Sequence, residues 1–235
     1  MIVYGRNPVR EAIRGPRPVY RAWATKNAAR EPWLTAAAIQ VDTVAADEIE
    51  RRCASAEHQG ICAETGPYRY AEPAAVLSLR RPLIVALDQV QDPQNLGAIC
   101  RSAECAGATA VVIPERRSAE VTAAVCKASA GAVEHLPVAR VRNLADFLTE
   151  AKQAGVWCYG ADGDAPLGYD AVDFDGPVAI VLGSEGRGLR PRVAAACDAL
   201  VSIPLRGRIE SLSVGAAAAV LLYAAAGAGG GAGTA

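Results

Sequence analysis

The stretch VAIVLGSEGRGL, residues 178–189, indicates most about how this chain folds. Its first half, residues 178–182, is a continuous apolar run, which is typical of a strand buried on both faces of a parallel sheet. Its second half is a loop that contains Gly183, Gly186 and Gly188. Glycine allows positive φ and lets another group approach the main chain closely. We therefore expect a buried strand that opens into a loop suited to holding a ligand.

The segment LVSIPLRGRIESLSVGAAAAVLLY, residues 200–223, repeats this pattern. It predicts a strand at 200–203, a turn at 204–207 and a helix of small residues from Ser211. In parallel sheets the loops at the carboxyl ends of the strands form the usual ligand crevice. The glycine spacing matches neither a Walker A phosphate loop nor the dinucleotide fingerprint, and a tight turn without a ligand is the alternative.

The length and composition allow one large domain or two small ones. The chain has 235 residues, of which 51% are hydrophobic, so it can build a sizeable core. No apolar run approaches the length of a membrane span, and the N-terminus MIVYGRNPVREAIR lacks the order of a signal peptide. We expect a cytoplasmic protein.

The cysteines and histidines suggest neither a metal site nor a disulfide framework. The seven cysteines include no C-x-x-C pair, and the two histidines, His58 and His135, are far apart in the sequence. Most of the cysteines have apolar neighbours, as small core residues do in a reducing compartment. We predict that the protein binds no metal.

The charge is unevenly distributed although the net charge is only −1. Residues 1–30 hold seven basic side chains against one acid, whereas residues 83–235 hold 12 basic and 16 acidic side chains. A basic end on a slightly acidic body is expected where one region contacts phosphate. The alternative is an ordinary solvated face.

Residues 1–66 predict a small α/β domain without a catalytic cluster, because helices and strands alternate along it. We expect its helices at 7–14, 32–38 and 46–54 and its strands at 19–25, 40–44 and 60–64. Residues 67–82 read as a linker with a short helix at 74–79. Its cluster Tyr68, Arg69 and Tyr70 could stack on RNA bases, but packing within the linker is the favoured interpretation.

Residues 83–226 predict a second α/β domain with about five parallel strands. The strands are expected at 83–88, 110–113, 156–159, 178–182 and 200–203, and the helices at 96–106, 119–130, 144–154 and 211–226. An acidic loop, residues 161–176, is expected to be solvated. The remaining residues, 227–235, are low in complexity and predicted to be disordered.

Three segments together resemble the ordered motifs of the SpoU (TrmH-like) family of RNA ribose 2′-O-methyltransferases. They are DQVQDPQNLGAICRSAECAG at 88–107, LGSEGRGL at 182–189 and IPLRGRIESLSV at 203–214. The similarity covers residues 82–223, and the N-terminal part resembles the family's small substrate-binding domain. YGRNPVREAI and KASAGAVEHLPVARVRNL, residues 127–144, are most similar to bacterial enzymes that methylate a guanosine of 23S rRNA.

The resemblance implies a SPOUT-type parallel-sheet domain with a C-terminal trefoil knot, and a homodimer. It also implies methyl transfer from S-adenosylmethionine to a ribose 2′-hydroxyl of RNA. A tRNA ribose methyltransferase is the alternative within this class. An RNA-binding protein without catalysis and a dinucleotide-dependent oxidoreductase are the alternatives outside it.

The same resemblance carries roles onto matching positions. Arg101 would bind and orient the target phosphate, since its high pKa makes arginine a poor base. Asn95 would hold the loop or the ribose, Glu185 would orient Arg101 or the substrate, and Ser211 would lie near the catalytic centre. The residues implied at the cofactor are Leu182, Gly183, Ser184, Gly186, Gly188, Ile203, Leu205 and Leu212.

One position departs from the family pattern. The family has S-L-N-V-S where this chain has S-L-S-V-G, so that Ser213 replaces an asparagine that belongs to the catalytic group. Asparagine reaches further and offers both donors and an acceptor. This departure motivates the alternative of a catalytically weakened RNA-binding homologue.

Overall fold

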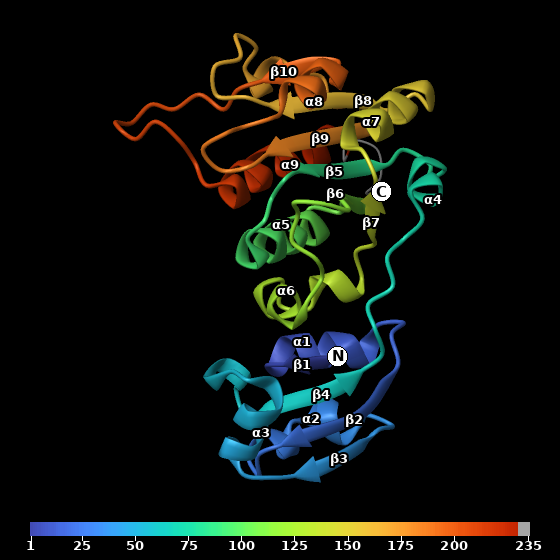
Figure 1. Cartoon of the computed structure of the whole chain (residues 1–235), viewed down its shortest axis with the longest axis vertical. Helices are drawn as coiled ribbons and strands as arrows, with labels where there is room; N and C mark the ends of the chain where they lie inside the picture. The colour runs from blue at the N-terminus through green and yellow to red at the C-terminus, as the bar shows by residue number, and fades with distance from the viewer. Residues whose placement is uncertain (230–235) are drawn as a thin grey trace, which may run out of the picture.

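A computed structural model describes residues 1–229 and reveals two α/β units, one above the other in Figure 1. The lower unit contains a four-stranded sheet and the upper unit a six-stranded sheet. Residues 227–229, expected to be disordered, belong to the last helix, α9 (Val214–Gly229). The rest of the predicted disordered tail, residues 230–235, lies outside the described residues.

The N-terminal sheet has the strand order β1-β4-β2-β3. Strands β2 and β3 run parallel, and the other two pairings are antiparallel. The elements are β1 (Ile2–Tyr4), α1 (Arg6–Arg14), β2 (Val19–Ala24), α2 (Pro32–Thr35), β3 (Gln40–Thr43), α3 (Ala46–Cys53) and β4 (Ile61–Thr65). Strand β1 was not predicted, since three residues before Gly5 are too few to show alternation.

The C-terminal sheet is wholly parallel, with the order β10-β8-β9-β5-β6-β7. Its strands are β5 (Leu83–Asp88), β6 (Ala110–Pro114), β7 (Val138–Val141), β8 (Trp157–Ala161), β9 (Val178–Gly183) and β10 (Ala199–Val201). The expectation of about five strands misses β7. This edge strand is short, and Arg140 interrupts its apolar pattern.

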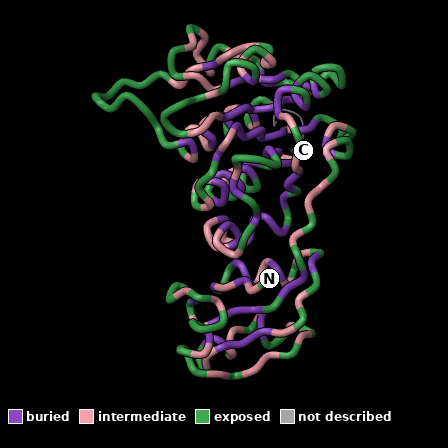
Figure 2. Tube along the Cα trace, in the orientation of Figure 1, coloured by how far each residue is buried: buried purple, intermediate pink, exposed green. Residues whose placement is uncertain are grey.

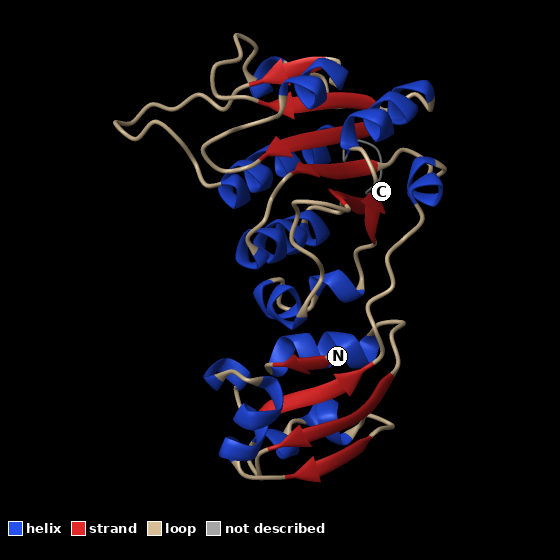
Figure 3. Ribbon diagram, viewed as in Figure 1, coloured by secondary structure: helices blue, strands red, loops and turns tan. Residues whose placement is uncertain are grey.

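Helices cover both faces of this sheet (Figures 1 and 3). Helices α5 (Pro93–Cys105) and α9 pack together on one face, with α6 (Ala123–Ala128) against α5. Helices α7 (Leu144–Gln153) and α8 (Pro191–Ala196) pack together on the other. Residues of β5 alternate between the two cores, Val85 and Leu87 in one and Ile84 and Ala86 in the other. Figure 2 shows that the central strands of this sheet are buried.

Several helices differ from their predicted bounds, among them α2, which ends at Thr35 rather than at residue 38. Helix α5 begins at Pro93 because the Asp92 side chain accepts a hydrogen bond from the backbone N of Gln94 at 2.9 Å. Helix α6 is shorter than predicted. Helix α8 was not predicted, since six residues are too few for a periodic pattern.

The linker packs against the C-terminal unit. Tyr68 donates a hydrogen bond to the carbonyl oxygen of Val133 at 3.1 Å, and its ring meets that of Tyr70 edge to face at 5.2 Å. The backbone N of Ala71 donates to the carbonyl oxygen of Val138 in β7 at 2.8 Å. A short helix, α4 (Pro73–Leu77), follows. The favoured reading of these tyrosines as packed residues agrees with this arrangement.

The basic N-terminal segment is largely neutralised by ion pairs. Five of its seven basic side chains contact carboxylates, namely Arg6, Arg10, Arg14, Arg17 and Arg21. Their partners include Glu31, Asp42 and Glu134, which lie outside residues 1–30. The basic surface available to a ligand is therefore smaller than the count of basic residues in the sequence indicates.

Candidate active site

A cavity of about 260 Å³ lies at the carboxyl ends of β8, β9 and β10. Its walls come from the loops after these three neighbouring strands and from the start of α9. The loop at 204–213, which extends away from the sheet in Figure 1 and is exposed throughout in Figure 2, closes one side. The cavity thus occupies the edge at which α/β proteins bind ligands.

The glycine loop after β9 folds back on the end of its own strand. The backbone N of Gly188 donates to the carbonyl oxygen of Ser184 at 3.0 Å. A Cβ atom at Gly183 would lie 2.1 Å from the carbonyl carbon of Gly188. Gly186 and Gly188 have φ of 76° and 62°. Glycine at 183 is thus required by the close approach of backbone to backbone, and glycine at 186 and 188 suits the left-handed conformation.

The far end of this loop is tied to β5. Asp88, the last residue of β5, is completely buried. Its carboxylate accepts hydrogen bonds from the backbone N of Arg190 at 2.9 Å and from Nε at 2.8 Å. Asp88 therefore holds the polypeptide where the glycine loop passes into α8.

The cavity brings together most of the predicted site residues. All eight positions implied at the cofactor line it, together with two of the implied catalytic residues. These ten are Leu182, Gly183, Ser184, Glu185, Gly186, Gly188, Ile203, Leu205, Ser211 and Leu212.

Asn95 lies in an adjoining cleft of about 330 Å³, beside the start of α5. Ser184, Glu185 and Val214 line both this cleft and the cavity, so the two hollows adjoin. Gln89 also lines the cleft. Asn95 and Glu185 therefore face the same polar space.

Arg101 and Ser213 line neither hollow. Arg101 is exposed on α5 and, within residues 1–229, forms no ion pair with Glu104 or another carboxylate. The Ser213 hydroxyl accepts a hydrogen bond from the backbone N of Ala216 at 3.3 Å, so this residue caps α9. The predicted helix start at Ser211 is corrected to Val214 by this cap.

The sequence interpretation missed several residues of the cavity. Asp162 and Gly163 follow β8 directly, and Glu210 belongs to the exposed loop. Asp162 was assigned to a solvated acidic loop, because only the strand order places the end of β8 beside that of β9. With Glu185, these residues give the cavity three carboxylates beside apolar side chains, a lining suited to a ligand that is partly apolar and carries positive charge.

Within residues 1–229, no group of three or more histidine, cysteine, aspartate or glutamate side chains could hold a metal ion. Among the helices of residues 1–229, none is both long and apolar enough to cross a membrane.

Comparison with known families divides the chain in two. Residues 82–223 match the model of the SpoU rRNA methylase family. Residues 2–71 match the model described as RNA 2′-O ribose methyltransferase substrate binding. The first match includes the cavity, the cleft and α5.

Individual proteins show the same similarity. A putative TrmH family tRNA/rRNA methyltransferase of Bacillus subtilis is 37% identical over 227 residues, covering 92% of this chain and 91% of its own. An AdoMet-bound rRNA methyltransferase from Sinorhizobium meliloti superposes with a TM-score of 0.79 at 26% identity. The superposition covers 95% of this chain and 85% of the relative. A putative RNA methyltransferase of the TrmH family from Porphyromonas gingivalis superposes with a TM-score of 0.77 at 29% identity. That superposition covers 95% of this chain and 88% of the relative. The chain belongs to the SpoU family of RNA methyltransferases.

Proposed function

We propose that this protein transfers a methyl group from S-adenosylmethionine to a ribose 2′-hydroxyl of RNA, with a guanosine of 23S rRNA as its target. The observation that carries the proposal is the cavity in which ten predicted site residues, from the segments at the ends of β9 and β10, meet. The AdoMet-bound relative from Sinorhizobium meliloti supports the cofactor. In this proposal residues 1–66 bind the RNA, residues 67–82 link the domains, and residues 83–226 bind the cofactor.

The lining of the cavity fits this cofactor. When bound, S-adenosylmethionine supplies a methyl group activated by a sulfonium centre. Ile203, Leu205 and Leu212 offer apolar surface for a flat ring, and the carboxylates of Asp162 and Glu210 suit a cationic ligand. The backbone at Gly186 is open to close contact, because a Cβ atom there would meet no atom within 4 Å.

The adjoining cleft fits the ribose. Asn95 can hold a sugar hydroxyl through its amide, and Glu185 reaches both the cleft and the cavity. Holding the hydroxyl in line with the methyl group removes an entropic barrier worth up to about 7–11 kcal/mol. Positioning is therefore the main task of these side chains.

The position of Arg101 supports the proposal of a homodimer, since Arg101 lies away from the cavity of its own chain. Six residues of an α-helix rotate about 600°, so that Arg101 and Asn95 point about 120° apart on α5. We infer that Arg101 contributes to the cavity of a second copy of the chain. The second copy would also cover two exposed apolar side chains, Tyr223 of α9, which is 57% exposed, and Ile209 of the loop, which is 76% exposed. The C-terminal trefoil knot, implied by the family resemblance, and a cytoplasmic location, expected from the sequence, belong to the same proposal.

Ser213 bears on whether the enzyme is active. Serine and asparagine are both good N-cap residues, so the start of α9 does not require the family's asparagine. We expect an active enzyme, and Ser213→Asn should change the rate of methyl transfer while leaving the helix intact. A rate that rises by more than about tenfold would favour the alternative of a weakened, RNA-binding homologue.

The role of Arg101 is tested by mixing two inactive variants. Arg101→Ala should keep its affinity for S-adenosylmethionine in calorimetry and lose transfer by on the order of 10²–10³-fold. Glu185→Ala should also lose transfer. If Arg101 acts across the dimer, co-refolding the two should restore about a quarter of wild-type activity, since half of the dimers are mixed and each has one intact site.

The same mixture can refute the arrangement. No recovery in mixed dimers, shown to form by differently tagged subunits, would place Arg101 and Glu185 in the same chain's site. Loss of cofactor affinity in Arg101→Ala would remove its proposed role at the RNA.

The target class is tested with unmodified 23S rRNA and tRNA transcripts side by side, because relatives are named as tRNA/rRNA methyltransferases. Methylation of tRNA alone would favour the tRNA alternative.

A further inference from the structure

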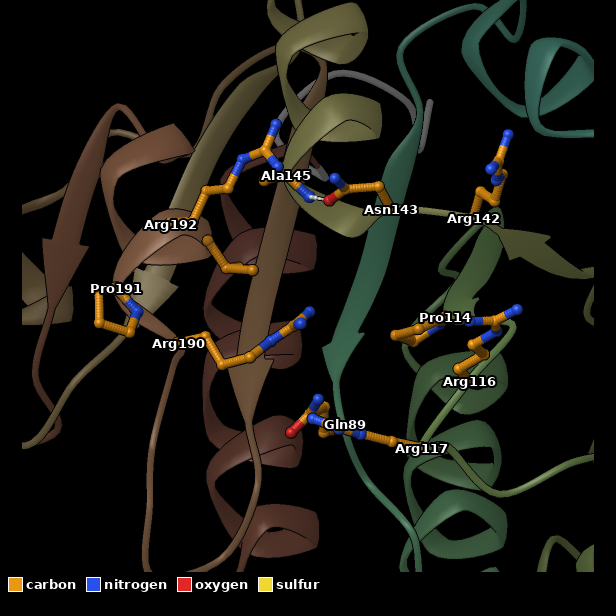
Figure 4. Close-up of a pocket in the computed structure, with 11 residues that line it drawn as sticks. Gln89, Pro114, Arg116, Arg117, Arg142, Asn143, Ala145, Arg190, Pro191 and Arg192 are labelled. Atoms are coloured by element: carbon orange, nitrogen blue, oxygen red, sulfur yellow. Dashed lines mark hydrogen bonds between the residues drawn. The ribbon is translucent and has the colours of Figure 1, made fainter.

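A second large hollow lies at the same edge of the C-terminal sheet, beyond the cleft that contains Asn95. It has a volume of about 610 Å³ and is bounded by the segments that follow β5, β6 and β7 and by the start of α8 (Figure 4). Figure 4 shows side chains from separate segments arranged around it. Five are arginines, namely Arg116, Arg117, Arg142, Arg190 and Arg192.

The hollow has an excess of positive charge. Arg190 is paired with the buried Asp88, and Arg192 with the exposed Asp146. Within residues 1–229, Arg116, Arg117 and Arg142 are exposed and form no ion pair, and no carboxylate lines the hollow. Three unneutralised guanidinium groups thus remain on a wall that has no compensating acid.

The start of helix α7 adds to this field. Asn143 lines the hollow and caps the helix, accepting a hydrogen bond from the backbone N of Ala145 at 3.0 Å, as Figure 4 shows. The N-terminus of a helix carries a partial positive charge. The arginines are the main source of positive charge in the hollow, and the helix N-terminus adds to it.

The hollow adjoins the proposed active site. Gln89 lines both the hollow and the cleft that contains Asn95 and Glu185. That cleft in turn shares Ser184 and Glu185 with the cavity. A chain of nucleotides whose target ribose lies in the cleft can therefore extend past Gln89 into the hollow.

We infer that this arginine hollow binds backbone phosphates of the RNA next to the target nucleotide. Arginine suits this task because its planar fork donates two parallel hydrogen bonds to phosphate oxygens. Such contacts fix the register of the RNA but do not read its sequence. The inference rests on the proposed function, and it gives the C-terminal domain its own RNA contact, separate from residues 1–66.

The test compares two triple variants that lower the net charge equally. In the first, Arg116, Arg117 and Arg142 become alanine. In the control, Arg80, Arg81 and Lys152 become alanine. Arg80 and Arg81 precede β5 and Lys152 is near the end of α7, so the control residues lie at the opposite, amino-terminal edge of the sheet. Cofactor affinity, measured by calorimetry, should be unchanged in both variants.

Binding of a fluorescein-labelled, mixed-sequence single-stranded RNA 20-mer is followed by anisotropy at several salt concentrations. The hollow variant should bind roughly tenfold or more weakly than the wild type. Its slope of log K against log salt should be smaller by about 2, because each phosphate contact contributes about 0.7 for a single strand. The control variant should change Kd by less than about twofold.

Three outcomes overturn the inference. They are equal losses in the two variants, an unchanged salt slope in the hollow variant, and no binding of the RNA by the wild type. Loss of inorganic phosphate binding with RNA affinity unchanged would also overturn it, in favour of a small-anion site. Failure of the proposed function is separate, since it would appear as absent cofactor binding or absent methyl transfer in the wild type.

Discussion

The guanidinium of Arg17 in the N-terminal domain is paired with the carboxylate of Glu134 in the C-terminal domain, and both side chains are buried. Only 5% of the Arg17 side chain and 1% of the Glu134 side chain are exposed. Arg17 Nε lies 3.1 Å from Glu134 Oε2, and Arg17 Nη1 donates to the carbonyl oxygen of Gly66. This pair joins segments 117 residues apart and fixes the N-terminal domain against the C-terminal domain.

Removing one partner of this pair should destabilise the protein strongly. Glu134→Ala leaves a buried guanidinium without its charge partner, and we expect a loss of about 3–5 kcal/mol in the free energy of unfolding. Urea denaturation measures it. The double variant Arg17→Met with Glu134→Leu should recover most of that loss, since apolar pairs replace buried ion pairs well. A single-variant cost below about 1 kcal/mol would show that the pair does not hold the interface.

Gly183→Ala should disrupt the cofactor cavity, because its Cβ would lie 2.1 Å from the carbonyl carbon of Gly188. The glycine loop must move away, and we expect the Kd for S-adenosylmethionine to rise at least about tenfold. Gly163→Ala is the matched control, since Gly163 also lines the cavity but a Cβ there meets no atom within 4 Å. Calorimetry checks both variants. Equal affinities would contradict the assignment of this loop.

Asp88→Asn tests the anchor of the glycine loop. The change removes the charge that Arg190 pairs with at 2.7 Å, and we expect a loss of about 1–3 kcal/mol in stability with weaker cofactor binding. Asp146→Asn removes the partner of Arg192, whose side chain is 74% exposed, and should cost less than about 0.5 kcal/mol. Thermal unfolding with and without cofactor compares the two. A similar, small effect of both would mean that Asp88 does not anchor the loop.

The thiols should differ sharply in reactivity. Burial raises the pKa of Cys100 to about 12 and that of Cys126 to about 11, so neither forms appreciable thiolate at pH 8. Cys105 is exposed and should react first with a disulfide reagent in the native protein. Cys105→Ser should abolish that fast phase. Rapid reaction of Cys100 or Cys126, identified by mass spectrometry, would show that the core opens readily.

The strands of the C-terminal domain were predictable where they were apolar throughout. Strands β5 and β9 are buried on both faces, and their sequences therefore lack polar interruptions. The same reasoning missed β7, an edge strand that contains Arg140, and β1, which has only three residues. Short edge elements depend on their neighbours for stability, so the local pattern does not reveal them.

The candidate site was predictable only in part. The family motifs identified the residues of the glycine loop and of the loop at 204–213, but the places of Asp162 and of the arginine hollow depend on strand order. Arg116, Arg142 and Arg190 are far apart in the sequence and meet because β9, β5, β6 and β7 are adjacent in the sheet. Charge counting instead pointed to residues 1–30, whose arginines are mostly paired.

We propose that the chain methylates the ribose of RNA. The most direct test incubates the wild-type protein with methyl-labelled S-adenosylmethionine and unmodified 23S rRNA, followed by alkaline hydrolysis. A 2′-O-methyl group blocks cleavage at its own nucleotide, so we expect label in one alkali-resistant dinucleotide that contains guanosine. Label released as a methylated base, or no transfer to rRNA or tRNA by a protein that binds the cofactor, would contradict it.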